Sequence, residues 1–153
     1  MTWQPHLTPY PSLGGLSVID AMHPALITCP QDSSLRTIAR MMATYRVHAI
    51  LVTAHGEDEL PGGGRWGIVS DIDVLRAGEE SDVDDVQAHT IAEQPVAAIA
   101  SSEPLRRAAA LMVERGVSHV IVIESRSGRP IGVLSTLDVA RALAGFPEQH
   151  PFH

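Results

Sequence analysis

The string GIVSDIDVLRAG, from Gly67 to Gly78, returns near the end of the chain as GVLSTLDVARAL, from Gly132 to Leu143. Both copies read glycine, two aliphatic residues, serine, two residues, aspartate, an aliphatic residue, one further residue and arginine. A motif that recurs together with its flanking pattern marks an internal repeat. The repeat therefore predicts two equivalent sites for one kind of chemistry.

The residues before the first string show helix and strand patterns. Asp32-Ser33-Ser34 is expected to cap a helix, because short polar side chains at this position accept hydrogen bonds from free backbone N–H groups. Two β-branched runs, at 47–53 and 66–69, predict short strands joined by a glycine-containing loop. Residues 70–77 then predict a helix that ends at Gly78.

The second copy repeats this order of elements. Ser101 or Ser102 is expected to cap its first helix, and Gly116 is expected to end it. Runs at 117–123 and 131–134 predict two strands joined by a tight turn at Ser127-Gly128. A last helix is expected from Ser135 to Ala144.

The repeat predicts both the fold class and the division of the chain. Each copy is a strand–helix–strand–strand–helix unit, so we expect an α/β (α+β) protein built from two β-α-β-β-α repeats with pseudo-two-fold symmetry. Neither copy is expected to bury its apolar face alone. The expected segments are an irregular N-terminal arm (1–16), repeat 1 (17–78), a linker (79–82), repeat 2 (83–145) and a C-terminal tail (146–153).

Composition excludes several classes of protein. A net charge of −7 argues against nonspecific nucleic-acid binding, which needs a basic surface. No apolar run approaches the ~20 residues that span a bilayer, and residues 1–15 lack the features of a signal peptide. The one cysteine, Cys29, excludes an intrachain disulfide and is typical of a reducing compartment. We expect a cytoplasmic protein with no nucleic-acid or membrane partner.

Neither catalytic nor metal chemistry is indicated. No serine lies in a G-x-S-x-G string, and the glycines at 62–64 lack the Lys-Ser/Thr that follows in a P-loop. His150 and His153 have no third ligand nearby in sequence. We expect neither a catalytic residue nor a metal site.

The repeat resembles the cystathionine-β-synthase (CBS) domain, present twice as a stand-alone Bateman module. The resemblance covers about residues 17–145 and rests on the leucine-rich helices, the strands VHAILV and VSHVIV, and the two Gly-aliphatic-x-Ser-x-x-Asp strings. It implies a regulatory, non-catalytic module that binds AMP, ADP, ATP or S-adenosylmethionine in two clefts between the repeats. It implies no required cofactor, and it favours a homodimer that acts on an unidentified regulated protein.

The resemblance also assigns residues to the two clefts. In the family, the aspartate of Ser-x-x-Asp holds the ribose hydroxyls, the serine lies by the ribose or phosphate, and the adenine rests against the opposite repeat. One cleft would combine Ser70 and Asp73 with Ala97, Val117, Ser118 and His119. The other would combine Ser135 and Asp138 with Ala25, Ile27, Val47, His48 and Ala49. Elementary chemistry supports such a use, because a carboxylate accepts both hydrogen bonds of a vicinal diol and a helix N-terminus suits phosphate.

Each assignment has an alternative. Ser-x-x-Asp before an apolar helix is also a capping-box pattern. Arg76 and Arg141 are candidates for phosphate contacts, but each is also placed to pair with the aspartate one helical turn earlier. Asp71 follows Ser70 where Thr136 follows Ser135, and its charge would repel phosphate, so the second cleft is the expected nucleotide site.

The two histidines of the predicted clefts also leave two functions open. His48 and His119 either contact a base or close the clefts. In the second case, the protein is a dimeric interaction scaffold with empty or histidine-plugged clefts, which docks through the helix after each Ser-x-x-Asp string.

Overall fold

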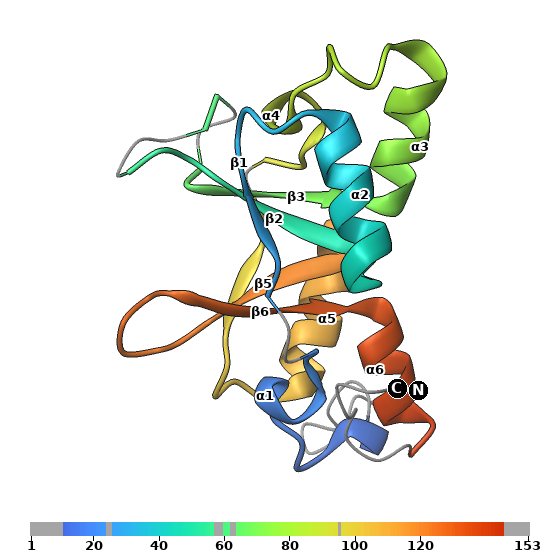
Figure 1. Cartoon of the computed structure of the whole chain (residues 1–153). Coiled ribbons are helices and arrows are strands. Elements are labelled where there is room, and N and C mark those ends of the chain that lie inside the picture. Colours follow the sequence, from blue (N-terminus) through green and yellow to red (C-terminus); the bar gives the residue numbers. More distant parts are fainter. Residues whose placement is uncertain (1–10, 24–25, 57–59, 62–63, 95, 146–153) are drawn as a thin grey trace. The chain divides into compact units, whose positions relative to one another are not determined.

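The computed structural model describes residues 11–23, 26–56, 60–61, 64–94 and 96–145, and it shows the predicted order of elements in both copies (Figure 1). The structure is mixed α/β with two three-stranded sheets, as predicted. The first copy contains β1 (Thr28–Pro30), α2 (Leu35–Tyr45), β2 (Ala49–Thr53), β3 (Trp66–Ser70) and α3 (Asp71–Glu80). The second contains β4 (Ala98–Ala100), α5 (Leu105–Arg115), β5 (His119–Ile123), β6 (Pro130–Ser135) and α6 (Thr136–Leu143).

Both sheets have the same topology and nearly the same register. In each, the first strand pairs in parallel with the second, and the second pairs antiparallel with the third. Ala49 lies opposite Ser70 in the first sheet, and His119 lies opposite Ser135 in the second. The serine of each Ser-x-x-Asp string therefore ends the third strand beside the start of the second.

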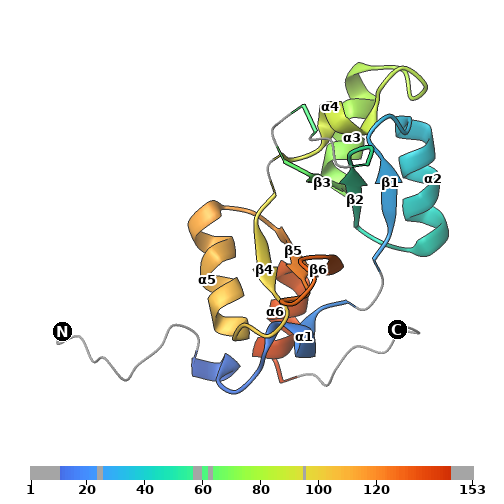
Figure 2. The same ribbon diagram turned by 90° about the vertical axis from the view of Figure 1, so that its left-hand side faces the viewer.

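The compact units of the structure are not the two sequence repeats. One unit, here called unit 1, runs up to Ala25 and resumes at Ala97, and unit 2 is Leu26–Val96. Unit 1 therefore combines the second copy with η1 (Pro11–Leu13) and α1 (Val18–Ala21). Unit 2 combines the first copy with α4 (Ala88–Ile91). The short helix that precedes each copy belongs to the unit built by the other copy (Figure 2).

Helix α1 is held by the start of α5. The Val18 N–H donates to the Glu103 carbonyl at 2.9 Å, and the Leu105 N–H donates to the Leu16 carbonyl at 2.9 Å. Val18 is completely buried in the core of unit 1. Its apolar neighbours there include Leu105, Ala108, Met112, Val120 and Leu134.

Helix α4 is held in the same way by the start of α2. The Ala88 N–H donates to the Ser33 carbonyl at 2.8 Å, and the Leu35 N–H donates to the Val86 carbonyl at 2.9 Å. Ala88 is completely buried in the core of unit 2. That core also contains Cys29, Ile38, Ile50, Val52, Leu60 and Val69. Neither core is completed by one sequence repeat alone.

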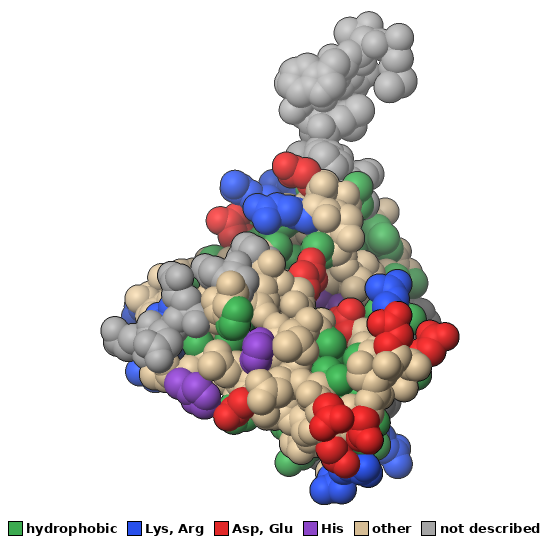
Figure 3. Space-filling view, turned by 90° about the horizontal axis from the view of Figure 1, so that it is seen from above, with side chains coloured by type: hydrophobic (Ala, Val, Ile, Leu, Met, Phe, Trp, Pro, Cys, Tyr) green, Lys and Arg blue, Asp and Glu red, His purple; other side chains and the backbone are tan. Residues whose placement is uncertain are grey.

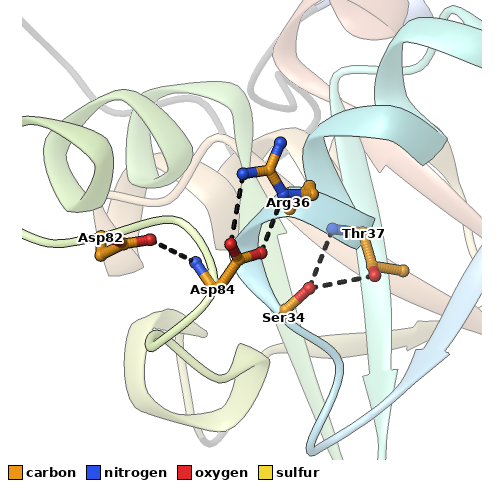
Figure 4. Close-up of polar contacts among 5 residues, drawn as sticks. All are labelled: Ser34, Arg36, Thr37, Asp82 and Asp84. Atoms are coloured by element: carbon orange, nitrogen blue, oxygen red, sulfur yellow. Dashed lines mark hydrogen bonds and ion pairs between the residues drawn. The ribbon is translucent and has the colours of Figure 1, made fainter.

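The segment that leads from α3 to α4 is also fixed to α2. The Arg36 guanidinium forms two hydrogen bonds to the Asp84 carboxylate, from Nε at 2.8 Å and from one terminal nitrogen at 3.2 Å (Figure 4). The Arg36 N–H donates to the Val83 carbonyl. Beside this ion pair Ser34 caps α2, because its Oγ accepts from the Thr37 N–H, which confirms the predicted cap. The guanidinium lowers the pKa of the Asp84 carboxyl below its usual value.

Two helix boundaries differ from the sequence prediction. Neither Ser101 nor Ser102 caps α5, whose N-cap residue is Pro104 with no side-chain hydrogen bond. The Ser101 carbonyl instead accepts from the Ile19 N–H of α1. Helix α3 passes through Gly78 and ends after Glu80, because a glycine inside a helix costs only about 1 kcal/mol relative to alanine. The predicted end of α5 at Gly116 is confirmed, with φ of 63° in the left-handed region.

No helix within the described ranges is both long and apolar enough to cross a bilayer. On the face drawn in Figure 3, basic side chains lie in small groups beside acidic ones.

The glycine that opens each repeated string lets a second segment pass close to the strand. A Cβ added at Gly67 would lie 2.9 Å from the Ala92 Cβ and 3.2 Å from the Glu93 carbonyl oxygen. A Cβ added at Gly132 would lie 3.0 Å from the Met22 sulfur and 3.2 Å from the His23 carbonyl oxygen. The residues after α4 and after α1 thus lie directly on β3 and β6.

We expect Gly67→Ala to lower the free energy of unfolding by about 1–3 kcal/mol, because the backbone near Ala92 must shift to admit the methyl group. Gly78→Ala is the matched control in the same unit. Its added Cβ meets nothing within 4 Å, so the helix should gain about 0.5–1 kcal/mol. Urea denaturation of both variants tests this. Equal stabilities for the two would contradict the close approach.

Candidate functional site

Each repeated string closes a hydrogen-bonded box at the start of a helix. At α6, the Ser135 N–H donates to Asp138 Oδ2 at 2.8 Å, and Ser135 Oγ accepts from the Asp138 N–H at 3.2 Å. At α3, the Ser70 N–H and hydroxyl both donate to Asp73 Oδ2 at 2.8 Å, and Ser70 Oγ accepts from the Asp73 N–H at 3.4 Å. The predicted capping role is therefore confirmed at both strings. Each box fixes a carboxylate at a helix N-terminus.

Capping does not use the whole carboxylate of Asp73. All of its side-chain hydrogen bonds fall on Oδ2, so among the described residues Oδ1 has no donor. Asp138 is the more buried of the two, with 5% of its surface exposed. A capping aspartate is thus compatible with a second role as an acceptor for a ligand hydroxyl.

A third Ser-x-x-Asp pattern shows that the box alone does not mark a site. Ser17 and Asp20 form the same contacts at α1, with the Ser17 N–H and hydroxyl each 2.8 Å from Asp20 Oδ2. These hydrogen bonds, chiefly the one from the backbone, lower the pKa of Asp20. Helix α1 has only four residues. The strings at α3 and α6 differ because each joins a sheet strand directly to a longer helix.

The start of the second strand borders each box within its own unit. The Thr136 N–H donates to the Ser118 carbonyl at 3.0 Å, and the Asp71 N–H donates to the His48 carbonyl at 2.9 Å. The side chains at these positions differ. His48 Nδ1 lies 3.2 Å from Asp71 Oδ2, and both side chains are exposed. In unit 1, Ser118 Oγ instead lies 2.9 Å from His119 Nδ1.

A third segment borders each box, and sequence reasoning missed it. Glu93 is bridged to Ile68 by two backbone hydrogen bonds, of 2.9 and 3.2 Å, and His23 is bridged to Val133. Ile68 and Val133 each lie two residues before the capping serine, so their side chains leave the strand on the same face as that serine. His23 and Glu93 are 70 positions apart, the offset that also relates the middle strands of the two copies. That offset is the sequence signal that identifies His23 and Glu93 as equivalent positions.

Glu93 adds a negative charge near the α3 box. The pKa of the Glu93 carboxyl is raised, first by partial burial and then by repulsion from Asp73. Asp71, Asp73 and Glu93 therefore place three carboxyl groups around the N-terminus of α3. At the corresponding places around α6 stand Thr136, Asp138 and His23.

The predicted site residues divide between the units. Unit 2 contains Ser70, Asp73, Ile27, Val47, His48 and Ala49. Unit 1 contains Ser135, Asp138, Ala97, Val117, Ser118 and His119. Each predicted cleft takes its Ser-x-x-Asp pair from one unit and its apolar wall from the other, so the two groupings stay predictions. Ala25 lies outside the described residues, as do His150 and His153.

Within the described ranges, no ion pair joins Arg76 to Asp73 or Arg141 to Asp138, and Arg76 is exposed. In the same part of the chain, no group of three or more His, Cys, Asp or Glu side chains could hold a metal ion. Burial raises the pKa of the Cys29 thiol, which disfavours the reactive thiolate.

The raised pKa of Glu93 predicts a pH-dependent effect of removing its charge. An acid whose pKa is raised by folding lowers the stability of the fold as pH rises from its unfolded-state pKa to the raised pKa, and it has no such effect at lower pH, where it is protonated in both states. Glu93→Gln should therefore raise the melting temperature at about pH 7 and leave it nearly unchanged at about pH 4. Thermal denaturation at both values tests this, with Glu124→Gln, an exposed site in unit 1, as the control. A gain that is equal at both pH values would rule out the charge as its cause.

The fold has many solved relatives. A CBS domain protein from Pyrobaculum aerophilum complexed with AMP is 27% identical, with a TM-score of 0.69 over 84% of this chain and 95% of that one. The CBS domain pair of protein MJ0100, in complex with 5-methylthioadenosine and S-adenosyl-L-methionine, is 18% identical, with a TM-score of 0.70 over 85% and 97%. The CBS domain of the bacterial CNNM/CorC family Mg²⁺ transporter in complex with ATP is 17% identical, with a TM-score of 0.71 over 88% and 92%.

Comparison with curated proteins found no match. The CBS domain family, however, matches the sequence twice, at residues 18–80 and 83–145. These two matches take in both repeated strings, both sheets and most of the described residues. The chain belongs to the CBS-domain family, with two CBS domains in tandem.

Proposed function

We propose that this protein is a regulatory module that binds an adenosine-type ligand at the Ser-x-x-Asp ends of α3 and α6. The observation that carries the proposal is the aspartate fixed at each helix start, at Asp73 and Asp138. A carboxylate held in this way accepts hydrogen bonds from both hydroxyls of a ribose, while free N–H groups and the helix dipole favour a nearby anion. The AMP, S-adenosyl-L-methionine and ATP complexes of the relatives support this class of ligand.

The α6 end is the better candidate for a nucleotide. Thr136 stands there where Asp71 stands at α3, so no second carboxylate follows the capping serine. Arg141, one turn further along α6, supplies a positive charge that forms no ion pair with any described residue. A phosphate group carries about −1.5 to −2 charges near neutral pH, so these differences favour it at α6.

The ligand would act as a signal rather than as a substrate. It shifts the protein toward whichever conformation binds it more tightly, and a regulated partner responds to that shift. This non-catalytic role accords with the family, and the sequence contains no nucleophile motif of the kinds considered above.

We expect AMP, ADP, ATP or S-adenosylmethionine to raise the melting temperature of the protein. At a thousandfold excess over Kd, one site contributes about 4 kcal/mol. Asp138→Asn should abolish the response to AMP, because it removes the charge and one carboxylate oxygen yet keeps an amide oxygen for capping. Asp73→Asn is the matched control at the same helix position. If no adenosine ligand shifts the wild-type melting temperature, the proposal is wrong.

We propose further that the protein is a homodimer joined through α3 and α6. Both helices expose large apolar side chains, with Leu75 69% and Leu137 52% exposed, beside Ile72 and Leu143. A two-fold axis lets a second copy cover such faces with the same surface. The same two helices would serve the alternative function, a dimeric scaffold that binds no nucleotide.

Light scattering at micromolar concentration should therefore give about twice the 16.4 kDa of one chain. Leu75→Lys combined with Leu137→Lys should shift the mass toward one chain. Val113→Lys, on the equally exposed Val113 of α5, should leave it unchanged. A monomeric wild type would contradict the dimer, and a dimer without any ligand response would favour the scaffold.

A further inference from the structure

We propose that the two Ser-x-x-Asp ends select ligands that differ in charge, with Asp71 and Glu93 making the α3 end specific for nucleosides without a phosphate. On this proposal the α3 end binds an uncharged or cationic adenosine derivative, and the α6 end binds a phosphorylated one. The inference rests on the proposed function, because it assumes that both ends bind an adenosine group. It deepens that function by assigning a ligand class to each end.

The argument starts from the shared part of the two ends. Both carry a serine–aspartate capping box, so both offer a ribose an aspartate carboxylate at the same helix position. Discrimination must come from the side chains around the box. These stand on two segments, the first residue of the helix and the residue bridged to the third strand.

At both positions the residue at the α3 end is acidic, and its counterpart at the α6 end is not. The first helical residue is Asp71 in α3 and Thr136 in α6. The bridged residue is Glu93 beside β3 and His23 beside β6. Around α3 the only described partner that offsets Asp71 is His48, at 3.2 Å, and it does so only when protonated. The α3 end therefore gathers three carboxyl groups where the α6 end has one.

The repulsion between these groups already has an effect without a ligand. Burial raises the pKa of the Glu93 carboxyl, and repulsion from Asp73 raises it further, so the two carboxyl groups lie close enough to interact. A phosphate would add about −1.5 to −2 charges beside this group. An uncharged nucleoside adds none, and a sulfonium ion such as that of S-adenosylmethionine is attracted.

The test measures AMP and adenosine binding to the full-length chain by isothermal titration calorimetry, because the two ligands differ only in the phosphate. Asp138→Asn leaves the α3 end intact, and there adenosine and S-adenosylmethionine should bind at least about tenfold more tightly than AMP, a difference of about 1.4 kcal/mol. Asp73→Asn leaves the α6 end intact, and there AMP should bind more tightly than adenosine.

Exchanging the residues that differ between the two ends then tests whether their charges cause the difference in ligand preference. In the Asp138→Asn chain, Asp71→Thr with Glu93→His should move the AMP-to-adenosine affinity ratio toward that of the α6 end by about tenfold. In the Asp73→Asn chain, Thr136→Asp with His23→Glu should move the ratio the other way. Glu79→Gln removes one charge near the opposite end of α3 and should leave the ratio unchanged. Glu93→Gln alone gives a smaller shift and serves if the double exchange unfolds the protein.

Salt provides a second readout that a steric cause would not reproduce. Exposed charges are screened over about 10 Å at 0.1 M salt, so the disadvantage of AMP at the α3 end should shrink as salt rises. Equal ratios at both ends, or a ratio that the exchanges leave unchanged, overturn this inference while nucleotide binding itself stands. If neither AMP, adenosine nor S-adenosylmethionine binds the wild-type protein, the proposed function fails together with it.

Discussion

The rest of the structure depends on the way in which each unit closes its core with a short helix that precedes the other copy in sequence. Val18 of α1 fills the core beside Leu105, and Ala88 of α4 fills the core beside Ile38. Backbone hydrogen bonds of 2.8–2.9 Å fix each short helix to the start of a longer one. Without these helices, both cores would present apolar surface to water.

This exchange also shapes the candidate site. After each short helix the chain turns onto the third strand of the same unit, where Gly67 and Gly132 leave room for it. The crossing segment brings Glu93 to one Ser-x-x-Asp box and His23 to the other. A feature that completes the core therefore also decides which charges surround each helix start. The same short segments, after α1 and after α4, therefore link the packing of each core to the charge around each Ser-x-x-Asp box.

Much of the fold could be predicted from the sequence, because its signals are local and occur twice. The helix–strand–strand–helix part of each copy followed from periodicity and turn residues, and the helix end at Gly116 followed from the need for a left-handed residue. The start of α5 was misjudged because the carbonyls near Ser101 bind α1, which is a tertiary contact. The four-residue helices α1 and α4 are too short to show a period, so their places could not be predicted.

The residues of the candidate site could be found in the sequence only in part. Ser70, Asp73, Ser135 and Asp138 follow from the repeated string itself. The position of Glu93 beside the α3 box does not, because it depends on a bridge to Ile68 that only the folded backbone makes. In the sequence, the only sign that Glu93 and His23 are equivalent positions is their separation of 70 residues, which also relates the middle strands of the two copies.

The exchange of short helices also sets the order in which the two units can fold during synthesis. Unit 2 is one continuous stretch, Leu26–Val96, inserted into a unit whose two parts lie on either side of it. A ribosome that adds about 5–20 residues per second completes unit 2 first, while α1 waits several seconds for the remainder of its own core. During that interval Val18 is exposed to solvent and to chaperones. Helix α1 is thus made before unit 2 and packs into its own core after unit 2 is complete.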